Sequence, residues 1–213
     1  MMSVTPKIDQ LVDAQDFRIK NFLYRTPLHI DVEQTRAAVE TLVDALGVRP
    51  NLEYSLNKLT RYALNLTSAT SSDTEAATAN RNCACHTTVN FAEFTNLIDI
   101  VKNTHIENVI NTVEDFHMAT YNKPLVGRHQ LVWSLPGYCD YPLHRDRHTT
   151  HRYHIPLQTT KEFYFIVEDE GVQYKLHLPS DGGVWYLASR DVTHTIRHFG
   201  TTPRLHLLLT SSV

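Results

Sequence analysis

The sequence lacks the features of a membrane, secreted or nucleic-acid-binding protein. No apolar run approaches the length of about 20 residues that a membrane-spanning helix needs, and the N-terminal stretch lacks the apolar centre of a secretory signal. Only three of the 213 residues are cysteines, too few for the disulfide framework of a small secreted domain. The formal net charge is -3, so there is no basic excess for phosphate backbones. We therefore expect a cytoplasmic protein with no membrane segment, and nucleic acid is not indicated as a partner.

The first half of the chain has the pattern of helices and loops. Its composition is that of an ordinary globular domain, with 42% hydrophobic and 20% charged residues. Asp31 is placed to cap a helix that Gly47 would end. A second helix is expected within residues 56–66. The helical spacing of apolar residues over 91–116 predicts one bent helix or two.

The second half has the pattern of short strands. From residue 129 onward, runs such as RYHIPL and RLHLLLT are rich in β-branched and aromatic residues, and turn sequences with Gly or Pro separate several of them. Many short strands with turns between them indicate a sandwich or barrel, and a double-sheet jelly roll is the expected form. The prediction is an α+β, mainly β protein. A helical region over 1–125 belongs to the same domain and packs on a β core over 126–213.

His144, Asp146 and His194 have the pattern of a metal site. In an extended segment, residues two apart point the same way, so His144 and Asp146 can reach one ion from one strand end. Two histidines and one carboxylate hold non-haem Fe(II) and leave coordination positions open, although Zn²⁺ accepts the same set. With 13 histidines in the chain, such a pattern also arises by chance from surface residues. The surrounding sequence must decide between these interpretations.

Two Arg-x-His pairs lie in otherwise apolar strand sequences: Arg152 with His154, and Arg204 with His206. If these pairs face inward they form a buried anion pocket, because buried charge is costly unless it is paired. If they face outward they are ordinary residues of an exposed sheet. A guanidinium binds a carboxylate through two parallel hydrogen bonds. Since Arg204 follows the second metal histidine by ten residues, the functional interpretation is a carboxylic-acid cosubstrate beside the iron.

Other residues with metal or pocket chemistry carry weaker signals. Segment 83–86 (CACH) lacks the C-x-x-C spacing of a zinc site and has no second pair, so we predict ordinary loop residues there. Trp133 and Trp185 are predicted core residues. Further pocket candidates flank or follow the triad: Asp140, Tyr141, Arg145, His148, His151, His177 and His198.

The sequence over 134–209 resembles the aspartyl/asparaginyl β-hydroxylase family of Fe(II)- and 2-oxoglutarate-dependent oxygenases. Members of that family show a Pro-Gly turn before the first histidine ligand and an R-x-H strand soon after it. A strand of the G-x-x-W type leads to the last histidine, and an arginine follows ten residues after that histidine. The matching runs here are, in order, SLPGYCDYPLHRD, RYHIPLQT, GGVWYLASRDVTHTI and RLHLLLT.

The resemblance implies a double-stranded β-helix of the cupin-like kind and an enzyme, a 2-oxoglutarate-dependent dioxygenase. Its cofactors would be Fe(II) and 2-oxoglutarate, and its partners would be O₂ and a peptide or small-molecule substrate. The implied catalytic and metal-binding residues are His144, Asp146 and His194. The residues implied to bind 2-oxoglutarate are Arg204, for the distal carboxylate, and His154, Arg152 and Ser134.

The substrate implied by the resemblance is a peptidyl Asp- or Asn-like side chain or an amino acid. Animal aspartyl hydroxylases of this family lack the carboxylate ligand, whereas Asp146 stands here in H-x-D. That feature resembles bacterial relatives, which include free proline hydroxylases. Hydroxylation of a free amino acid such as proline, or of another small molecule, is therefore an alternative. An alternative of another class is a cupin-like binding or structural module without turnover.

Overall fold

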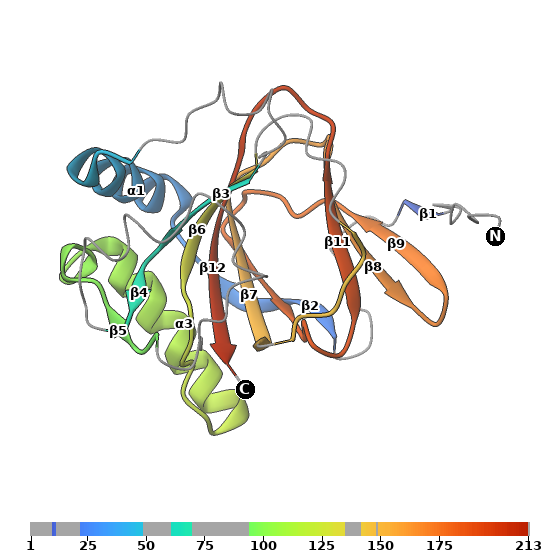
Figure 1. Ribbon diagram of the computed structural model, residues 1–213, viewed down its shortest axis with the longest axis horizontal. Coiled ribbons are helices and arrows are strands. Elements are labelled where there is room, and N and C mark those ends of the chain that lie inside the picture. Colours follow the sequence, from blue (N-terminus) through green and yellow to red (C-terminus); the bar gives the residue numbers. More distant parts are fainter. Residues whose placement is uncertain are drawn as a thin grey trace.

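Two β-sheets face each other, and two α-helices cover the outer face of the larger sheet (Figure 1). The computed structural model describes residues 10–11, 22–48, 61–69, 94–134, 142–147 and 149–212. The six strands of the larger sheet lie in the order β2 (Leu23–His29), β10 (Gly183–Leu187), β7 (Thr149–Gln158), β12 (Arg204–Ser212), β6 (Gln130–Ser134) and β3 (Arg61–Asn65). The four strands of the smaller sheet lie in the order β1 (Gln10–Leu11), β9 (Val172–Leu176), β8 (Phe163–Asp169) and β11 (Thr193–His198).

Strands that are distant in sequence lie side by side in both sheets. The C-terminal strand β12 lies between β7 and β6, and β11 pairs with β8. All of these pairs are antiparallel, and among the described strands only the short β1 runs parallel to its neighbour β9. This arrangement confirms the predicted mainly β, double-stranded β-helix with helices packed on one side.

The alternation of side chains along β12 divides the interior into two parts. Leu205, Leu207 and Leu209 pack in the core that lies under the helices. Arg204 and Leu208 face the opposite way and line a cavity between the sheets. Because successive strand residues point to opposite faces, one strand serves both the core and the cavity.

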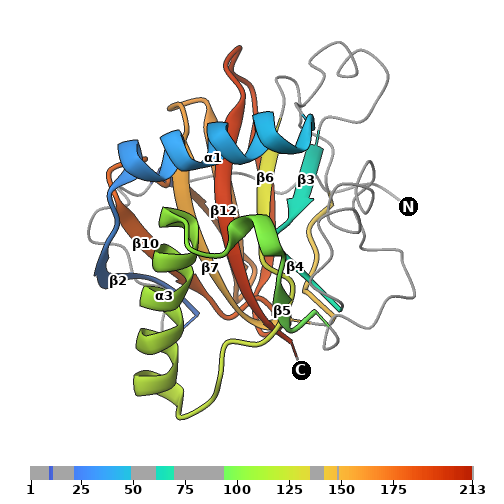
Figure 2. The same cartoon turned by 90° about the vertical axis from the view of Figure 1, so that its left-hand side faces the viewer.

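Helix α1 (Val32–Leu46) begins and ends where the sequence predicts. The Asp31 side chain accepts a hydrogen bond from the backbone N–H of Gln34 at 2.9 Å, which satisfies one of the free donors of the first turn. Gly47 ends the helix with φ 64°, a left-handed conformation that glycine adopts at little cost. Figure 2 shows α1 crossing in front of the strands of the larger sheet.

Helix α3 (His105–Tyr121) begins well after the start of the helical region that was predicted over 91–116, and it extends past the end of that region. Before it, residues 96–97 form strand β5 (Asn96–Leu97), which pairs with β4 (Thr67–Ser68). The 3-10 helix η4 (Asp99–Val101) follows. The apolar residues in this stretch are buried or half-buried as expected, but they reach the core from extended and 3-10 backbone.

The helix predicted within 56–66 is wrong over residues 61–65, which form strand β3. The strand pairs with β6 in antiparallel register, with Tyr62 opposite Trp133 and Leu64 opposite Leu131. The Tyr62 and Trp133 rings lie 5.5 Å apart in an edge-to-face contact. This pairing satisfies the backbone of the segment and buries Leu64, so tertiary contacts outweigh the weak local helical pattern.

Strand β2 also belongs to the first half and was not predicted. It pairs with β10 and forms one edge of the larger sheet.

None of the described helices is long and apolar enough to span a membrane. Segment 83–86 and the pocket candidates Asp140, Tyr141 and His148 lie outside the described residues.

Candidate functional site

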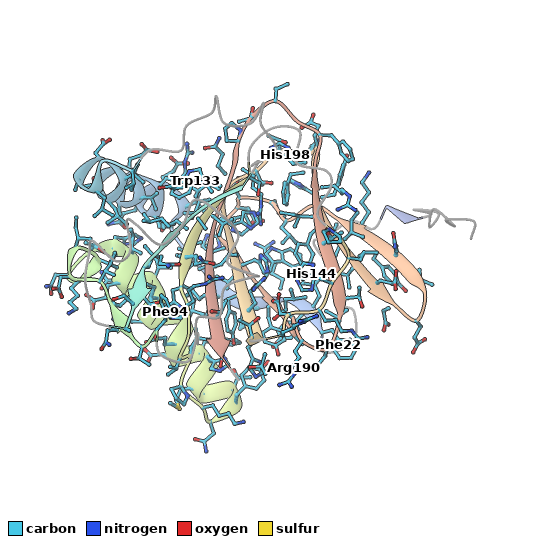
Figure 3. The ribbon with its side chains drawn as sticks, in the orientation of Figure 1. Phe22, Phe94, Trp133, His144, Arg190 and His198 are labelled. Carbon is cyan, nitrogen blue, oxygen red and sulfur yellow. The ribbon has the colours of Figure 1, made fainter. Side chains whose placement is uncertain are left out.

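Backbone pairing brings His144 and His194 together although 50 residues separate them in the sequence. The His144 N–H donates to the His194 carbonyl at 3.0 Å, and the His194 N–H donates to the His144 carbonyl at 2.8 Å. Their rings lie 4.5 Å apart, centroid to centroid. Together with Asp146 they offer ligand atoms that all lie within 4.8 Å of one another. Figure 3 shows His144 between the two sheets.

Hydrogen bonds to backbone carbonyls orient both histidines. The Nδ1 atom of His144 lies 3.0 Å from the Pro142 carbonyl, and that of His194 lies 3.1 Å from the Val192 carbonyl. A carbonyl only accepts, so Nδ1 carries a proton in both rings, and Nε2 is the atom that carries the lone pair in the neutral tautomer. Fixing the tautomer in this way is typical of histidines that bind a metal.

Of the two triad histidines, His194 is the one whose environment more clearly requires a ligand. It is buried, and its Nε2 has no hydrogen-bond partner among the described residues. Burial lowers the pKa of His194 to about 4, so the ring is neutral and able to coordinate a cation at pH 7. A buried and unsatisfied nitrogen is costly in a structure without a bound ion, so the residues fit a metal such as Fe(II).

Asp146 is held as a charged carboxylate. Burial alone would raise its pKa, but the Arg152 guanidinium and the nearby His144 outweigh burial and hold the pKa of Asp146 well below its usual range. Arg152 Nη2 lies 2.8 Å from Asp146 Oδ2. The Thr149 hydroxyl donates to the same oxygen at 2.9 Å. The other oxygen, Oδ1, lies 3.6 Å from His144 Nε2.

An open cavity adjoins the triad, and its empty volume of about 380 Å³ includes space that is continuous with solvent. Its wall includes the triad histidines, three of the four predicted cosubstrate residues, three apolar side chains and one threonine: His144, Arg152, His154, Phe165, His194, Thr195, Ile196, Arg204 and Leu208. Arg152 pairs in register with Thr210 near the end of β12, whereas Arg204 begins that strand. The two arginines therefore lie toward opposite ends of the cavity, with His154 between them.

Arg204 is buried, and it contacts the side chains of Ser134, His206 and Phe163. Its Nη1 donates to the Ser134 hydroxyl at 3.3 Å, and its Nη2 contacts His206 Nδ1. The guanidinium also lies 4.1 Å from the centroid of the Phe163 ring. Ser134 therefore contacts Arg204, and it is not among the residues that line the cavity.

The orientation of the two Arg-x-His pairs, which the sequence left open, is inward. His154, Arg204 and His206 are buried, and the Arg152 side chain is 15% exposed. Burial is the largest cause that lowers the pKa values of His154 and His206 well below the ordinary value, and the nearby arginines lower them further. Neither ring nitrogen of His154 has a hydrogen-bond partner among the described residues. This ring can therefore still form hydrogen bonds with a molecule in the cavity that it lines.

Several weaker candidates lie away from the cavity. Arg145 is exposed, and its Nε donates to the Thr193 hydroxyl. His151 contacts the Tyr186 hydroxyl, and His198 donates to the Thr202 carbonyl. His177 does not line the cavity either. Trp185 and Trp133 are buried, as predicted.

Thr149, Ser189 and Phe163 lie at the site but were not predicted from the sequence. Thr149 and Ser189 support Asp146, and Phe163 lies against Arg204. Threonine, serine and phenylalanine are common, and nothing in their spacing distinguishes them from ordinary strand residues. Only the pairing of strands places them beside the site.

Solved structures match nearly the whole chain, whereas no family model and no curated protein matches its sequence. An oxidoreductase of the 2OG-Fe(II) oxygenase family from Burkholderia pseudomallei aligns with a TM-score of 0.57 at 15% identity, over 94% of each chain. AviO1 from Streptomyces viridochromogenes aligns with a TM-score of 0.52 at 13% identity, over 90% of each chain. The dioxygenase for auxin oxidation 1 from Arabidopsis thaliana, in its complex with 2-oxoglutarate, aligns at 0.51 and 13%, over 90% of this chain and 84% of that one.

The chain therefore has the fold of the 2OG-Fe(II) oxygenases. At this level of identity the likeness shows the fold alone. The narrower resemblance to aspartyl/asparaginyl β-hydroxylases stays a prediction from the sequence.

Proposed function

We propose that the protein is an Fe(II)- and 2-oxoglutarate-dependent dioxygenase that hydroxylates its substrate. The observation that carries this proposal is the cluster of His144, Asp146 and His194, whose two histidines line the same cavity as Arg204. Two histidines and one carboxylate suit a divalent cation, and a buried arginine suits a carboxylate. The fold supports the same function.

The residues around the cavity have distinct roles in this proposal. His144, Asp146 and His194 hold the metal, and Arg204 binds the distal carboxylate of 2-oxoglutarate. Bound Fe(II), together with 2-oxoglutarate and O₂, would supply the oxidising chemistry that inserts an oxygen atom into a substrate C–H bond. Apolar wall residues such as Phe165, Ile196 and Leu208 limit the access of water.

Two substrate classes are consistent with the proposal. The sequence resemblance favours an Asp or Asn side chain in a peptide, or an amino acid. The presence of Asp146 in H-x-D favours a free amino acid such as proline or another small molecule. We therefore propose that both classes be tested against the same protein.

The decisive experiment measures O₂ consumption and succinate formation with Fe(II) and 2-oxoglutarate, across panels of peptides and free amino acids. The expected result is succinate formation that a substrate stimulates and that His194→Ala abolishes. If 2-oxoglutarate binds but no succinate forms with any panel member, the protein is a binding module. If His194→Ala forms succinate as fast as the parent, the proposed metal site is wrong.

A further inference from the structure

Arg152 forms an ion pair with Asp146, the carboxylate that is proposed to bind the metal. The resemblance places it among the residues that hold the cosubstrate, yet its Nη2 lies 2.8 Å from Asp146 Oδ2. Both side chains are largely buried, with 15% exposure for Arg152 and 13% for Asp146. A close ion pair with little solvent around it has a defined geometry, unlike a pair of exposed side chains.

A second group of contacts holds the same carboxylate. The Thr149 hydroxyl donates to Asp146 Oδ2 at 2.9 Å and lies 3.1 Å from the Ser189 hydroxyl. The backbone N–H of Asp146 donates to the Ser189 carbonyl at 2.9 Å. The backbone and one side-chain oxygen of Asp146 are therefore both held in place.

The two oxygens of Asp146 consequently have different environments. Oδ2 receives hydrogen bonds from Arg152 and Thr149, and these two donors use its accepting capacity. Oδ1 lies on the side of the histidines, 3.6 Å from His144 Nε2. A carboxylate fixed in this way offers one oxygen to an ion between Asp146 and the two histidines.

We propose that Arg152 is a positioning residue for the metal site, which holds Asp146 so that only Oδ1 binds the metal. This inference rests on the proposed function, because it requires a metal at the triad. One-oxygen binding leaves more coordination positions open for the cosubstrate and O₂ than binding through both oxygens. Arg152 also compensates the buried charge of Asp146 when no metal is bound.

The test measures metal binding without turnover. Co²⁺ is titrated into the parent, Arg152→Gln and Thr149→Val, and both affinity and the visible spectrum of the bound Co²⁺ are recorded. Loss of a residue that orients a metal ligand typically lowers affinity by about 10–100-fold, and we expect Arg152→Gln to fall in that range. Thr149→Val keeps the ion pair and should lose less, with a spectrum shifted in the same direction. It also provides a second variant if Arg152→Gln does not fold.

Two controls separate positioning from a general effect of charge. Arg190 is an exposed arginine in the turn before β11, labelled in Figure 3, and Arg190→Gln removes the same charge without touching Asp146. It should leave Co²⁺ affinity within about twofold of the parent. In an Asp146→Ala background, Arg152→Gln should produce no further loss, because the residue through which it acts is gone.

The affinity for 2-oxoglutarate, measured at saturating Co²⁺, decides between the two roles of Arg152. Near-parent affinity in Arg152→Gln, with weakened Co²⁺ binding, supports positioning. Unchanged Co²⁺ binding with at least tenfold weaker 2-oxoglutarate binding overturns it in favour of a cosubstrate role, and leaves the proposed function standing. An equal loss of Co²⁺ affinity in the Asp146→Ala background also overturns it. If the parent itself binds no metal at the triad, the proposed function fails together with this inference.

Discussion

A buried histidine in α3 is expected to make the stability of the fold depend on pH. His117 is fully buried between α3 and the larger sheet, where its Nδ1 lies 2.9 Å from the Tyr153 hydroxyl. Its Nε2 has no hydrogen-bond partner among the described residues. Burial, and to a smaller extent the nearby His151, lower the pKa of His117 to about 4.

The direction of the effect follows from proton uptake by the two states. An unfolded histidine has a pKa of about 6.5. Between this pH and about 4, His117 therefore binds a proton in the unfolded chain but stays neutral in the folded protein. Stability therefore falls as pH decreases from about 6.5 toward about 4, and it does not change with His117 above this window. The full difference corresponds to about 3 kcal/mol, of which about 2 kcal/mol is lost by pH 5.

Urea unfolding of the protein without added metal, at pH 7.5 and pH 5.0, measures this contribution. Other groups also titrate, so the quantity of interest is the pH-dependent change in the free energy of unfolding in the parent minus that in His117→Gln. We expect the variant to be less stable at pH 7.5, because it loses packing, but to lose about 2 kcal/mol less on acidification. The exposed His29 provides a control, since His29→Gln should keep the parental dependence. An unaltered pH dependence in His117→Gln would refute the conclusion that the fold keeps this imidazole neutral.

Three further predictions concern the site and the first helix. His194→Ala should abolish or severely reduce Fe(II) binding in anaerobic titrations, because two ligands rarely hold a labile divalent ion, and unchanged affinity would rule out the assignment. Arg204→Ala should weaken 2-oxoglutarate binding by roughly two to four powers of ten, since truncating one member of a buried charge pair costs about 3–5 kcal/mol, while Fe(II) binding stays nearly intact. Arg204→Lys should rescue poorly because an ammonium lacks the two-point contact, and parental cosubstrate affinity in either variant would contradict the role of Arg204. Asp31→Ala should lower the free energy of unfolding by about 1 kcal/mol in urea titrations through loss of the helix cap, and an unchanged midpoint would show that the cap contributes nothing.

The parts of the fold with strong local signals were predictable from the sequence. Asp31 and Gly47 mark the ends of α1 because their side-chain and backbone preferences act within one turn. The strands from β6 onward were predictable because alternation and turn residues recur along the whole second half.

Strands β2 and β3 were not predictable because their partners are remote in sequence. β2 contains Pro27, which is unusual in a strand and is accommodated here at a sheet edge. β3 has an apolar pattern that also suits a helix, and its pairing with β6 decides the outcome. Edge strands from the first half therefore complete a sheet whose centre comes from the second half.

The candidate site was predictable in its ligand types and not in its supporting contacts. His144, Asp146 and His194 are identified by chemistry and order along the chain. The contact between Arg152 and Asp146 depends on how the chain turns from residue 146 into β7, and no spacing rule specifies that geometry. The same holds for His206, whose ring contacts Arg204 from the next inward position of β12.

The two faces of the larger sheet explain how the protein combines stability with a polar cavity. Toward the helices, β12 and β7 present Leu207, Leu209 and Ile155 to a continuous apolar core. Toward the smaller sheet, the same strands present Arg204 and His154 to the cavity, and the burial of the unpartnered His154 ring nitrogens opposes folding unless a ligand satisfies them. The apolar face offsets this cost in the ligand-free protein. Ligands that bind the cavity face should therefore stabilise the fold by mass action, because they can bond to the ring nitrogens of His154.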